Sequence, residues 1–374
     1  MAGRTQETLY ADIDLELSWS ETQLPQVERT KHVHALHPYL GKYVPQLVET
    51  FLHRYFKPGD SIFDPFVGSG TTLVEANVYG AHSIGCDISA FNCLLSRVKT
   101  TQYSLATTEM ALKVALAEAR QGGPSDTSGS SQWLRDWYSP RALGELLAYR
   151  NAIAELDDPA WDVGRVILSR SARSARLTTH YDLDFPRLPQ RDAYYCHKHK
   201  RTCRPVDEAA KFLSRYTLDT IKRLREFATL QTPQSVEVLH EDSQLVELPA
   251  SVSGVITSPP YPGLIDYHEQ HRYAYELLEL ADRQVEEIGA ANLGKSRSAL
   301  DNYQTSMAAV LRNAVDQMTS GGVVVIVVND SKSLYRDILE RAGLTLQVNL
   351  TRHVNRRTGR RAGEFFESIL VCRS

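Results

Sequence analysis

The chain contains 374 residues, of which 42% are apolar and 23% are charged, and its formal net charge is -3. A chain of this length can bury a large core, as one large domain with an insertion or as two domains, whereas a net charge so near zero excludes a general polycation. The five cysteines do not make a disulfide framework, and no apolar run suits a secretory signal or a membrane span, which predicts a cytoplasmic protein without membrane attachment.

The N-terminal part of the chain has the pattern of one β–α–β unit. Helical apolar spacing covers residues 45–55, and buried strands are predicted at residues 61–64 and 82–87, with a helix at residues 72–79 between them. Strands joined in this way are parallel with a right-handed crossover. The segment therefore predicts the start of an α/β sheet.

The loop after the first strand is Asp64-Pro-Phe-Val-Gly-Ser-Gly-Thr-Thr72. Its glycines, Gly68 and Gly70, allow the backbone to approach a ligand at a helix N-terminus. A phosphate-binding P-loop would require a lysine where Thr71 stands, and the dinucleotide fingerprint would require a small residue where Leu73 stands. The remaining interpretation is a site for a different nucleotide-like cofactor, with Asp87 placed to accept hydrogen bonds from its ribose hydroxyls. The alternative is that the glycines only permit a turn and that Asp87 caps a helix.

The middle of the chain, from Asp87 to Val236, is much longer than the single helix and loop that a minimal doubly wound domain needs there. It begins with helical sequence, passes through a Gly- and Ser-rich linker at residues 121–131, and continues with further helices. We therefore expect a mainly helical inserted subdomain over residues 100–235.

The C-terminal part returns to strand patterns, predicted at residues 236–240, 252–257 and 322–328. Residues 344–350 and 365–372 flank an arginine-rich turn and are typical of an antiparallel hairpin at a sheet edge. The predicted fold is therefore α/β, with a mostly parallel sheet that ends in an antiparallel hairpin.

A second motif, Thr257-Ser-Pro-Pro-Tyr261, follows an apolar strand and so lies at the carboxyl edge of the sheet, where α/β folds bind ligands. The prolines remove two amide donors and leave carbonyl oxygens free. The Ser258 hydroxyl and the Pro259 carbonyl could accept from the exocyclic amine of a base, and the Tyr261 ring could stack on it for about 1 to 3 kcal/mol. A Pro-Pro turn with a packed tyrosine is the alternative interpretation.

Together these two motifs resemble those of the amino-directed DNA methyltransferases, which transfer a methyl group from S-adenosylmethionine to N4 of cytosine or N6 of adenine. The resemblance extends to His37-Pro-Tyr-Leu-Gly-Lys-Tyr-Val-Pro45, to Ile84-Gly-Cys-Asp87 and to Glu241-Asp-Ser243. It implies a Rossmann-like class I methyltransferase sheet divided between residues 1–99 and 236–374, S-adenosylmethionine as cofactor and double-stranded DNA as substrate.

The resemblance also implies roles for single residues. The implied cofactor-binding residues are Tyr39, Lys42, Asp64, Phe66, Gly68, Gly70, Thr71, Thr72, Asp87 and Asp242. The implied catalytic residues are Ser258, Pro259, Pro260 and Tyr261. In this family a serine at the first position of the Pro-Pro-Tyr motif favours cytosine N4, and aspartate or asparagine favours adenine N6. Transfer to cytosine C5 needs a nucleophilic cysteine that follows a proline. None of the five cysteines follows a proline, so transfer to C5 is excluded.

Three alternatives remain open: an N6-adenine DNA methyltransferase, an RNA guanine-N2 methyltransferase and a noncatalytic DNA-binding specificity subunit. In one arrangement of the family with this motif order, the recognition domain lies between the positions of Asp242 and Ser258, a gap too short for it here. The DNA-recognition region is therefore not assigned by the motif order.

Basic segments predict the DNA contacts. Five arginines crowd the final hairpin, at Arg352, Arg356, Arg357, Arg360 and Arg361, where they could neutralise phosphates. A second arginine group, within residues 165–176, is equally consistent with a solvated face. Nucleoid association and a cognate restriction endonuclease as partner follow as further expectations from a DNA methyltransferase.

Residues 196–203 read Cys-His-Lys-His-Lys-Arg-Thr-Cys, with two thiols and two imidazoles able to hold zinc. The segment lacks the paired Cys-x-x-Cys spacing of ordinary structural sites. We therefore predict no metal from the sequence alone.

Overall fold

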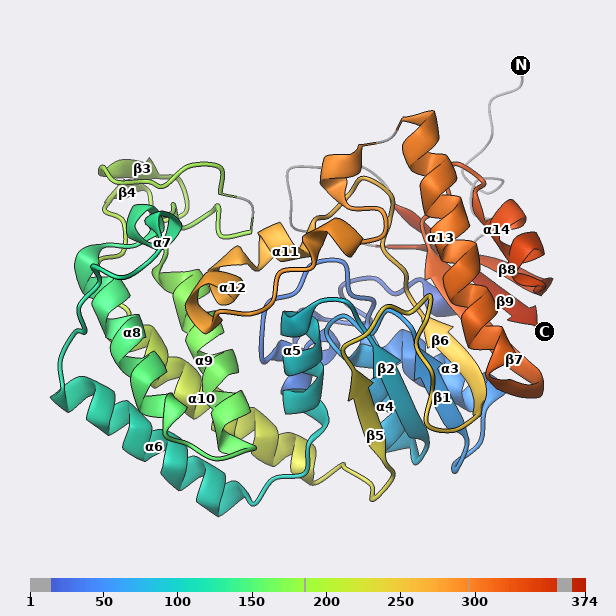
Figure 1. Ribbon diagram of the computed structural model, residues 1–374, viewed down its shortest axis with the longest axis horizontal. Coiled ribbons are helices and arrows are strands. Elements are labelled where there is room, and N and C mark those ends of the chain that lie inside the picture. The colour runs from blue at the N-terminus through green and yellow to red at the C-terminus, as the bar shows by residue number, and fades with distance from the viewer. Residues whose placement is uncertain (1–14, 185, 295, 355–364) are drawn as a thin grey trace.

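The computed structural model describes residues 15–184, 186–294, 296–354 and 365–374. Its centre is a seven-stranded sheet in the order β5-β2-β1-β6-β7-β9-β8 (Figure 1). The strands are β1 (Ser61–Asp64), β2 (His82–Cys86), β5 (Val236–Leu239), β6 (Val252–Thr257), β7 (Met318–Val328), β8 (Thr345–His353) and β9 (Phe366–Arg373). Strands β5, β2, β1, β6 and β7 are parallel, and β9 is antiparallel to both β7 and β8. The predicted mostly parallel sheet with an antiparallel edge hairpin is confirmed.

Alternating side chains on the strands produce the two cores of this α/β fold. Phe63 of β1 faces α13 (Arg297–Asp316) and α14 (Tyr335–Ala342), whereas its neighbour Ile62 faces α3 (Pro45–Tyr55) and α4 (Thr71–Tyr79). Valines of β7 alternate between the same two cores. Each such buried side chain contributes about 1.5 to 3 kcal/mol, so both faces of the sheet must be covered.

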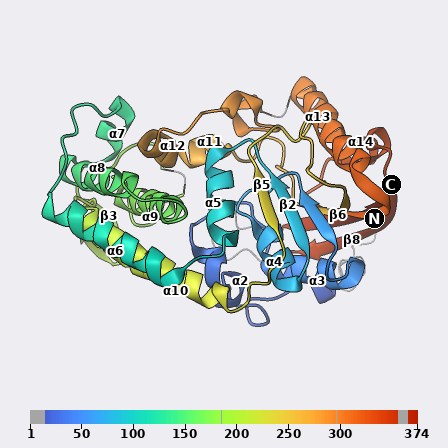
Figure 2. The same ribbon diagram turned by 60° about the horizontal axis from the view of Figure 1, so that its bottom comes forward.

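A group of helices, referred to as the helical segment, lies beside the sheet (Figure 2). It contains α6 (Leu105–Gln121), α7 (Gln132–Trp137), α8 (Pro140–Ala154), α9 (Ala160–Ala175) and α10 (Ala210–Ala228). A separate two-stranded sheet, β3 (Tyr194–Cys196) and β4 (Arg201–Cys203), lies between α9 and α10 in the chain. Serine side chains cap two of the helices: Ser131 accepts from Leu134 N–H at α7, and Ser139 accepts from Ala142 N–H at α8.

One apolar cluster joins these helices to helices of the sheet domain. It includes residues of α5 (Ala90–Thr100) and of α12 (Arg272–Leu278), which follows the Pro-Pro-Tyr motif. The remaining short elements are η1 (Leu15–Leu17), α2 (Gln26–Arg29), η2 (His32–Ala35), α11 (Tyr267–Gln270), η3 (Gln284–Glu286) and η4 (Ala291–Leu293). Among the described residues, no helix combines the length and apolarity needed to cross a membrane.

Gly254 is a position where the packing of the sheet can be tested. A Cβ atom at this residue of β6 would lie 2.4 Å from the Val323 carbonyl oxygen and 2.6 Å from the Phe56 ring. We expect Gly254→Ala to lower the free energy of unfolding by about 1 to 3 kcal/mol, because neither the strand backbone nor the packed, partly buried Phe56 ring can move aside freely. Urea unfolding measures this, with Gly129→Ala as control because nothing lies within 4 Å of the position that its Cβ would take. Equal stabilities for the two variants would contradict the close packing.

Candidate active site

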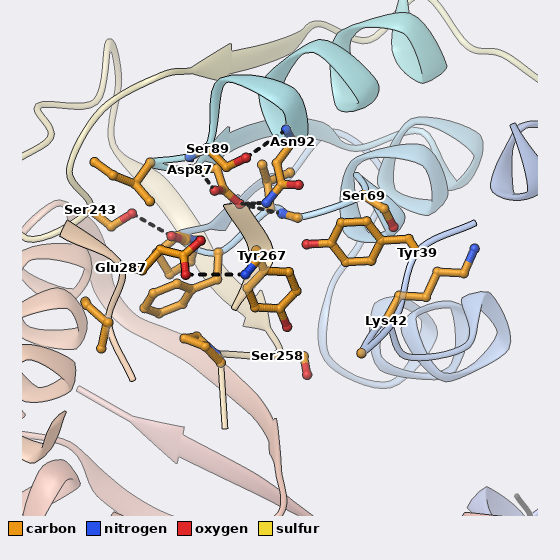
Figure 3. A pocket seen from close by; sticks show the side chains of 18 of the residues that line it. Tyr39, Lys42, Ser69, Asp87, Ser89, Asn92, Ser243, Ser258, Tyr267 and Glu287 are labelled. Atoms are coloured by element: carbon orange, nitrogen blue, oxygen red, sulfur yellow. Dashed lines mark hydrogen bonds between the residues drawn. The ribbon is translucent and has the colours of Figure 1, made fainter. Parts of the chain in front are cut away.

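A pocket with an empty volume of about 810 Å³ lies at the carboxyl ends of β1, β2 and β6 (Figure 3). It brings together parts of both sequence motifs, although they are far apart in the chain. The residues predicted from the sequence that line it are Tyr39, Lys42, Phe66, Gly68, Thr71, Asp87, Asp242, Ser258 and Pro260.

Asp64 lies beneath this pocket rather than in its lining. The side chain is 1% exposed and accepts hydrogen bonds from the Thr72 hydroxyl at 2.5 Å, the Thr257 hydroxyl at 2.7 Å and the Phe66 N–H at 3.1 Å. Burial raises the pKa of the carboxyl group to about 6, and the three hydrogen bonds oppose that rise. Asp64 therefore connects the loop after β1 by hydrogen bonds to β6, the strand that leads into the Pro-Pro-Tyr motif.

Thr72 and Gly70 also support the loop from below. The Thr72 hydroxyl contacts the Tyr43 hydroxyl in addition to Asp64. Gly70 has φ +76, and a Cβ there would lie 2.9 Å from the Ser96 hydroxyl oxygen and 3.1 Å from the Ser96 Cα. The absence of a side chain thus allows α5 to approach the loop closely.

Gly68 is the glycine of the loop that lines the pocket. Its φ is +49, and a Cβ would lie 3.0 Å from the Tyr39 hydroxyl. Two neighbouring hydroxyl oxygens, Ser69 Oγ and Thr71 Oγ1, are buried and have no hydrogen-bond partner among the described residues. Both residues line the pocket beside the N-terminus of α4. Buried hydroxyls without partners at a helix N-terminus are ready to bind a polar or anionic ligand group.

Asp87 follows β2 and is held in a fixed orientation. One carboxylate oxygen accepts from the Ser89 N–H at 2.9 Å, and the other accepts from the Gly68 N–H at 2.9 Å and the Asn92 side-chain amide at 3.1 Å. Burial raises the pKa of Asp87, and these three hydrogen bonds oppose the rise. The oxygen that accepts only from Ser89 retains acceptor capacity for a ligand hydroxyl.

The opposite wall of the pocket is aromatic. Tyr39 stacks on Tyr267 with ring centroids 5.7 Å apart and an interplanar angle of 19°, and it also stacks on His271. Lys42 lines the pocket with its stem, but its Nζ donates to the His34 carbonyl at 2.6 Å and points away from Tyr39 in Figure 3. Burial and the nearby Arg223 lower the pKa of Lys42 to about 8.

Acidic residues line another side of the pocket. Asp242 lines the pocket and turns its carboxylate back to accept from the Gln244 N–H at 2.9 Å. Its neighbour Ser243 donates to the Pro65 carbonyl at 2.5 Å, which ties this turn to the loop after β1. Glu287 also lines the pocket and accepts from the His268 N–H at 2.9 Å.

Sequence reasoning did not identify Asn92, Tyr267 or Glu287 as parts of the site. Asn92 had a usable signal, because it lies in the first turn of the helix that follows Asp87. Tyr267 and Glu287 have no local motif; they reach the pocket only because the chain after the Pro-Pro-Tyr motif folds back over it.

The Ser258-Pro-Pro-Tyr261 turn is held from three elements. The Ser258 hydroxyl donates to the Val327 carbonyl of β7 at 3.1 Å. The Pro260 carbonyl accepts from the Tyr303 hydroxyl of α13 at 2.9 Å. Tyr261 donates to Glu367 of β9 at 2.9 Å.

The half-buried Tyr261 packs beside the pocket and does not line it. Burial and the Glu367 carboxylate raise the pKa of Tyr261 well above its ordinary range, so the phenol stays protonated and donates. Phe365 lies beside the ring with centroids 6.3 Å apart. These contacts fix the plane of the aromatic ring.

Arg352, one of the five arginines predicted to contact DNA, is buried. Its Nε donates to Glu367 at 2.8 Å, and the side chain is 5% exposed. Glu367 thus bridges Arg352 to Tyr261, and we assign Arg352 this positioning role instead of a phosphate contact. The other four predicted DNA-contacting arginines, Arg356, Arg357, Arg360 and Arg361, lie outside the described residues.

Three arginines of the second group lie on α9 and pair with carboxylates of this chain. Arg170 contacts Asp219 at 2.5 Å and Arg165 contacts Asp162 at 3.0 Å, while Arg173 pairs with Asp184. Arg176 is buried against the Tyr273 ring. These contacts hold the helical segment together.

Comparison with known proteins shows which proteins this chain is similar to. A family model for N6/N4 methyltransferases, described as DNA methylase, matches residues 5–97. Type II methyltransferase M.MjaII of Methanocaldococcus jannaschii is 35% identical over 97% of this chain and 84% of its own length. Type II methyltransferase M.BsoBI of Geobacillus stearothermophilus is 23% identical over 81% of this chain and 65% of its own length. Among solved structures, TrmN from Thermus thermophilus matches with 13% identity and a TM-score of 0.35, covering 89% of this chain and 50% of its own.

The raised pKa of Asp64 predicts a specific pH dependence of stability. Its folded-state pKa of about 6 lies above the ordinary 3.8, so the folded protein holds this proton more tightly than the unfolded chain does. The resulting stabilisation, about 3 kcal/mol for the full shift, is present below the ordinary pKa and is lost as the pH rises through 6.

Urea unfolding of wild type and Asp64→Asn, from about pH 4.5 to about pH 8, measures this effect. The free energy of unfolding of the wild type minus that of the variant should fall as the pH rises. Asp301→Asn, an exposed change on α13, should show no such trend. A difference that stays constant or grows with pH would contradict the raised pKa.

Proposed function

Because the chain belongs to the amino-directed DNA methyltransferase family, we propose that it transfers the methyl group of S-adenosylmethionine to N4 of cytosine in double-stranded DNA. The single observation that carries the proposal is the Ser258 hydroxyl, which lines the pocket and donates its proton to the Val327 carbonyl. With its proton engaged there, the oxygen can offer only lone pairs to the pocket. A group in this state accepts from an amine.

The donors and acceptors of the pocket fit S-adenosylmethionine, which supplies an electrophilic methyl group on a positively charged sulfur. Ser69 and Thr71 hydroxyls, buried and without partners among the described residues, suit a carboxylate at the N-terminus of α4. Asp87 would accept from the ribose hydroxyls, and Asp242 would lie on the adenine side. Tyr39 and Tyr267 supply aromatic faces, which attract cations.

The acceptor amine needs to be oriented more than it needs a general base to remove its proton. An exocyclic amine is a poor nucleophile, because its lone pair is delocalised into the ring. If Ser258 Oγ and the Pro259 carbonyl accept its two N–H bonds, the lone pair is directed out of the plane of the base. Such an attack would form one N–C bond and break one S–C bond, leaving a neutral thioether, and the resulting ammonium, a strong acid, would pass its proton to solvent. No metal or covalent enzyme intermediate is required.

A base flipped from the duplex would stack on Tyr261. The ring plane is fixed in advance by Glu367 and Arg352, so less side-chain entropy is lost on binding. Stacking of about 1 to 3 kcal/mol per base is comparable with the few kcal/mol that flipping costs.

The choice of cytosine over adenine rests on the resemblance that associates serine at position 258 with N4 transfer. Adenine N6 is the second candidate, because a serine hydroxyl can accept equally well from its amine. We further propose that residues 100–235 and the four arginines at 356, 357, 360 and 361 contribute to DNA binding. The type II relatives also suggest a cognate restriction endonuclease as partner.

Expression in a bacterial host without DNA methyltransferases of its own tests the function, because the host genome samples every short recognition sequence. Nucleoside digestion and mass spectrometry should detect N4-methylcytosine. N6-methyladenine instead would overturn the cytosine assignment and leave the family function intact. No modified base, together with no transfer from labelled S-adenosylmethionine to purified DNA, would overturn the proposed function itself.

The Ser258 role predicts a kinetic result. Ser258→Ala should lower kcat by about 10²-fold, because the amine loses one of its two orienting acceptors. Cofactor affinity should change little. The matched control is Ser251→Ala, an exposed serine in the loop before β6, which should keep wild-type kcat. Equal rates for Ser258→Ala and Ser251→Ala would contradict the assignment.

Asp87 predicts a result on cofactor binding alone. Asp87→Asn should weaken S-adenosylmethionine binding by roughly 10-fold to 100-fold, because hydrogen bonds to a charged group contribute about 1.5 to 3 kcal/mol. Isothermal titration calorimetry without DNA measures this. Asp301→Asn is again the control, and an unchanged Kd for Asp87→Asn would exclude Asp87 from the cofactor site.

A further inference from the structure

A cluster of metal-binding side chains lies at the β3–β4 hairpin, outside the candidate active-site pocket. Four ligand atoms, one each from His180, Cys196, His199 and Cys203, all lie within 4.8 Å of one another. Three of the residues belong to the hairpin. His180 reaches it from the segment between α9 and β3. Figure 1 shows the hairpin at the α7 end of the helical segment.

Two distances within this cluster match those of a tetrahedral zinc site. His199 Nδ1 lies 3.6 Å from Cys196 Sγ and 3.5 Å from Cys203 Sγ. Zinc bonds of about 2.3 Å to sulfur and about 2.0 to 2.1 Å to nitrogen, set at the tetrahedral angle, separate adjacent sulfur and nitrogen ligands by about 3.6 Å. One imidazole nitrogen at this distance from two sulfurs is therefore positioned as a third ligand beside them.

His180 is oriented by a neighbour in the way that zinc-binding histidines usually are. Its Nδ1 contacts the Tyr194 hydroxyl at 2.8 Å, and the same hydroxyl accepts from the His180 backbone N–H at 2.9 Å. An outer hydrogen bond to one ring nitrogen leaves the other, Nε2, for the metal. The rings of His180 and His199 meet edge to face with centroids 4.8 Å apart.

The hairpin has almost no other source of stability. Within residues 191–204, all of which the structure describes, only Cys196 and Cys203 are buried. Each strand has three residues, and an isolated two-stranded hairpin is at best marginally stable in water. Both cysteines are free thiols, not a disulfide. A metal ion would supply the cross-link that an apolar core does not.

We propose that His180, Cys196, His199 and Cys203 bind one zinc ion in a structural Cys2His2 site. Two thiolates balance the charge of Zn²⁺, and binding releases their protons. Because the protein fills all four positions, no position is open for water or substrate, and the site is structural instead of catalytic. The zinc fixes the hairpin to the segment after α9.

A second group of potential ligands, His32, His34 and Glu75, does not support the same conclusion. Glu75 already pairs with His34 Nε2 at 2.6 Å and with Lys31 Nζ at 3.1 Å. Lysine charges therefore occupy the surroundings in which a cation would have to bind. At the hairpin, by contrast, two cysteines face the cluster.

Metal analysis of the full-length protein tests the proposal. Protein purified without chelators should contain about one zinc per chain by mass spectrometry of the metal. Cys203→Ser and His180→Ala should lose most of it. His197→Ala is the matched control, because this histidine belongs to the same hairpin but packs on the Tyr195 ring and is outside the cluster. Equal zinc loss in His197→Ala and Cys203→Ser would contradict the ligand set.

Two measurements on the wild type keep the proposal testable if a variant fails to fold. Cobalt(II) added to the metal-free protein should give the absorption of tetrahedral thiolate coordination. Limited trypsin digestion should cut within residues 198–204 after chelation and should be suppressed when zinc is restored. A wild type that binds neither zinc nor cobalt, and whose hairpin resists trypsin equally with and without chelator, would overturn the site.

Discussion

The structure depends on one buried carboxylate, Asp64. It accepts from Thr72 at the start of α4 and from Thr257 at the end of β6. The two sequence motifs are therefore joined directly, one residue before Ser258. Burial of a charge is costly unless its oxygens are satisfied, and here three donors surround it. Burial raises the pKa of Asp64, whereas the hydrogen bonds that oppose this rise fix the distance between the loop after β1 and the Pro-Pro-Tyr turn.

The turn itself is rigid because three other elements hold it. Val327 of β7, Tyr303 of α13 and Glu367 of β9 each bond to a different residue of Ser258-Pro-Pro-Tyr261. The antiparallel edge hairpin, which in a sequence looks like an appendage to the parallel sheet, thus supports the site through Glu367. Positioning of reacting groups depends on such supports, since small displacements reduce rates strongly.

Local patterns predicted the sheet and some of the residues that line the pocket, and particular residues show why. The alternation that places Ile62 and Phe63 in opposite cores can be predicted from the local sequence, and so can the position of Asp87 at the end of β2. Contacts between distant segments cannot be predicted from local sequence. Glu287 has no motif, and Arg352 sits in a run of arginines in which nothing local distinguishes the one that finds a buried carboxylate. His180 belongs to the metal-ligand cluster only through the fold of the chain after α9.

The helical segment is coupled to the cofactor pocket through packing, although its sequence looks like an insertion. Its apolar cluster includes Leu94 and Val98 of α5 and Leu277 of α12, so the core continues beyond residues 100 and 235. Tyr275 of α12 contacts the Ser89 hydroxyl at 2.8 Å, and the backbone N–H of Ser89 donates to Asp87. A displacement of the helices would therefore move α12, and with it the residues that orient the Asp87 carboxylate. Close-packed interiors transmit such shifts because they leave little free volume to absorb them. Events at the helical segment and at the cofactor pocket are thus connected by contacts that are already present in the folded chain.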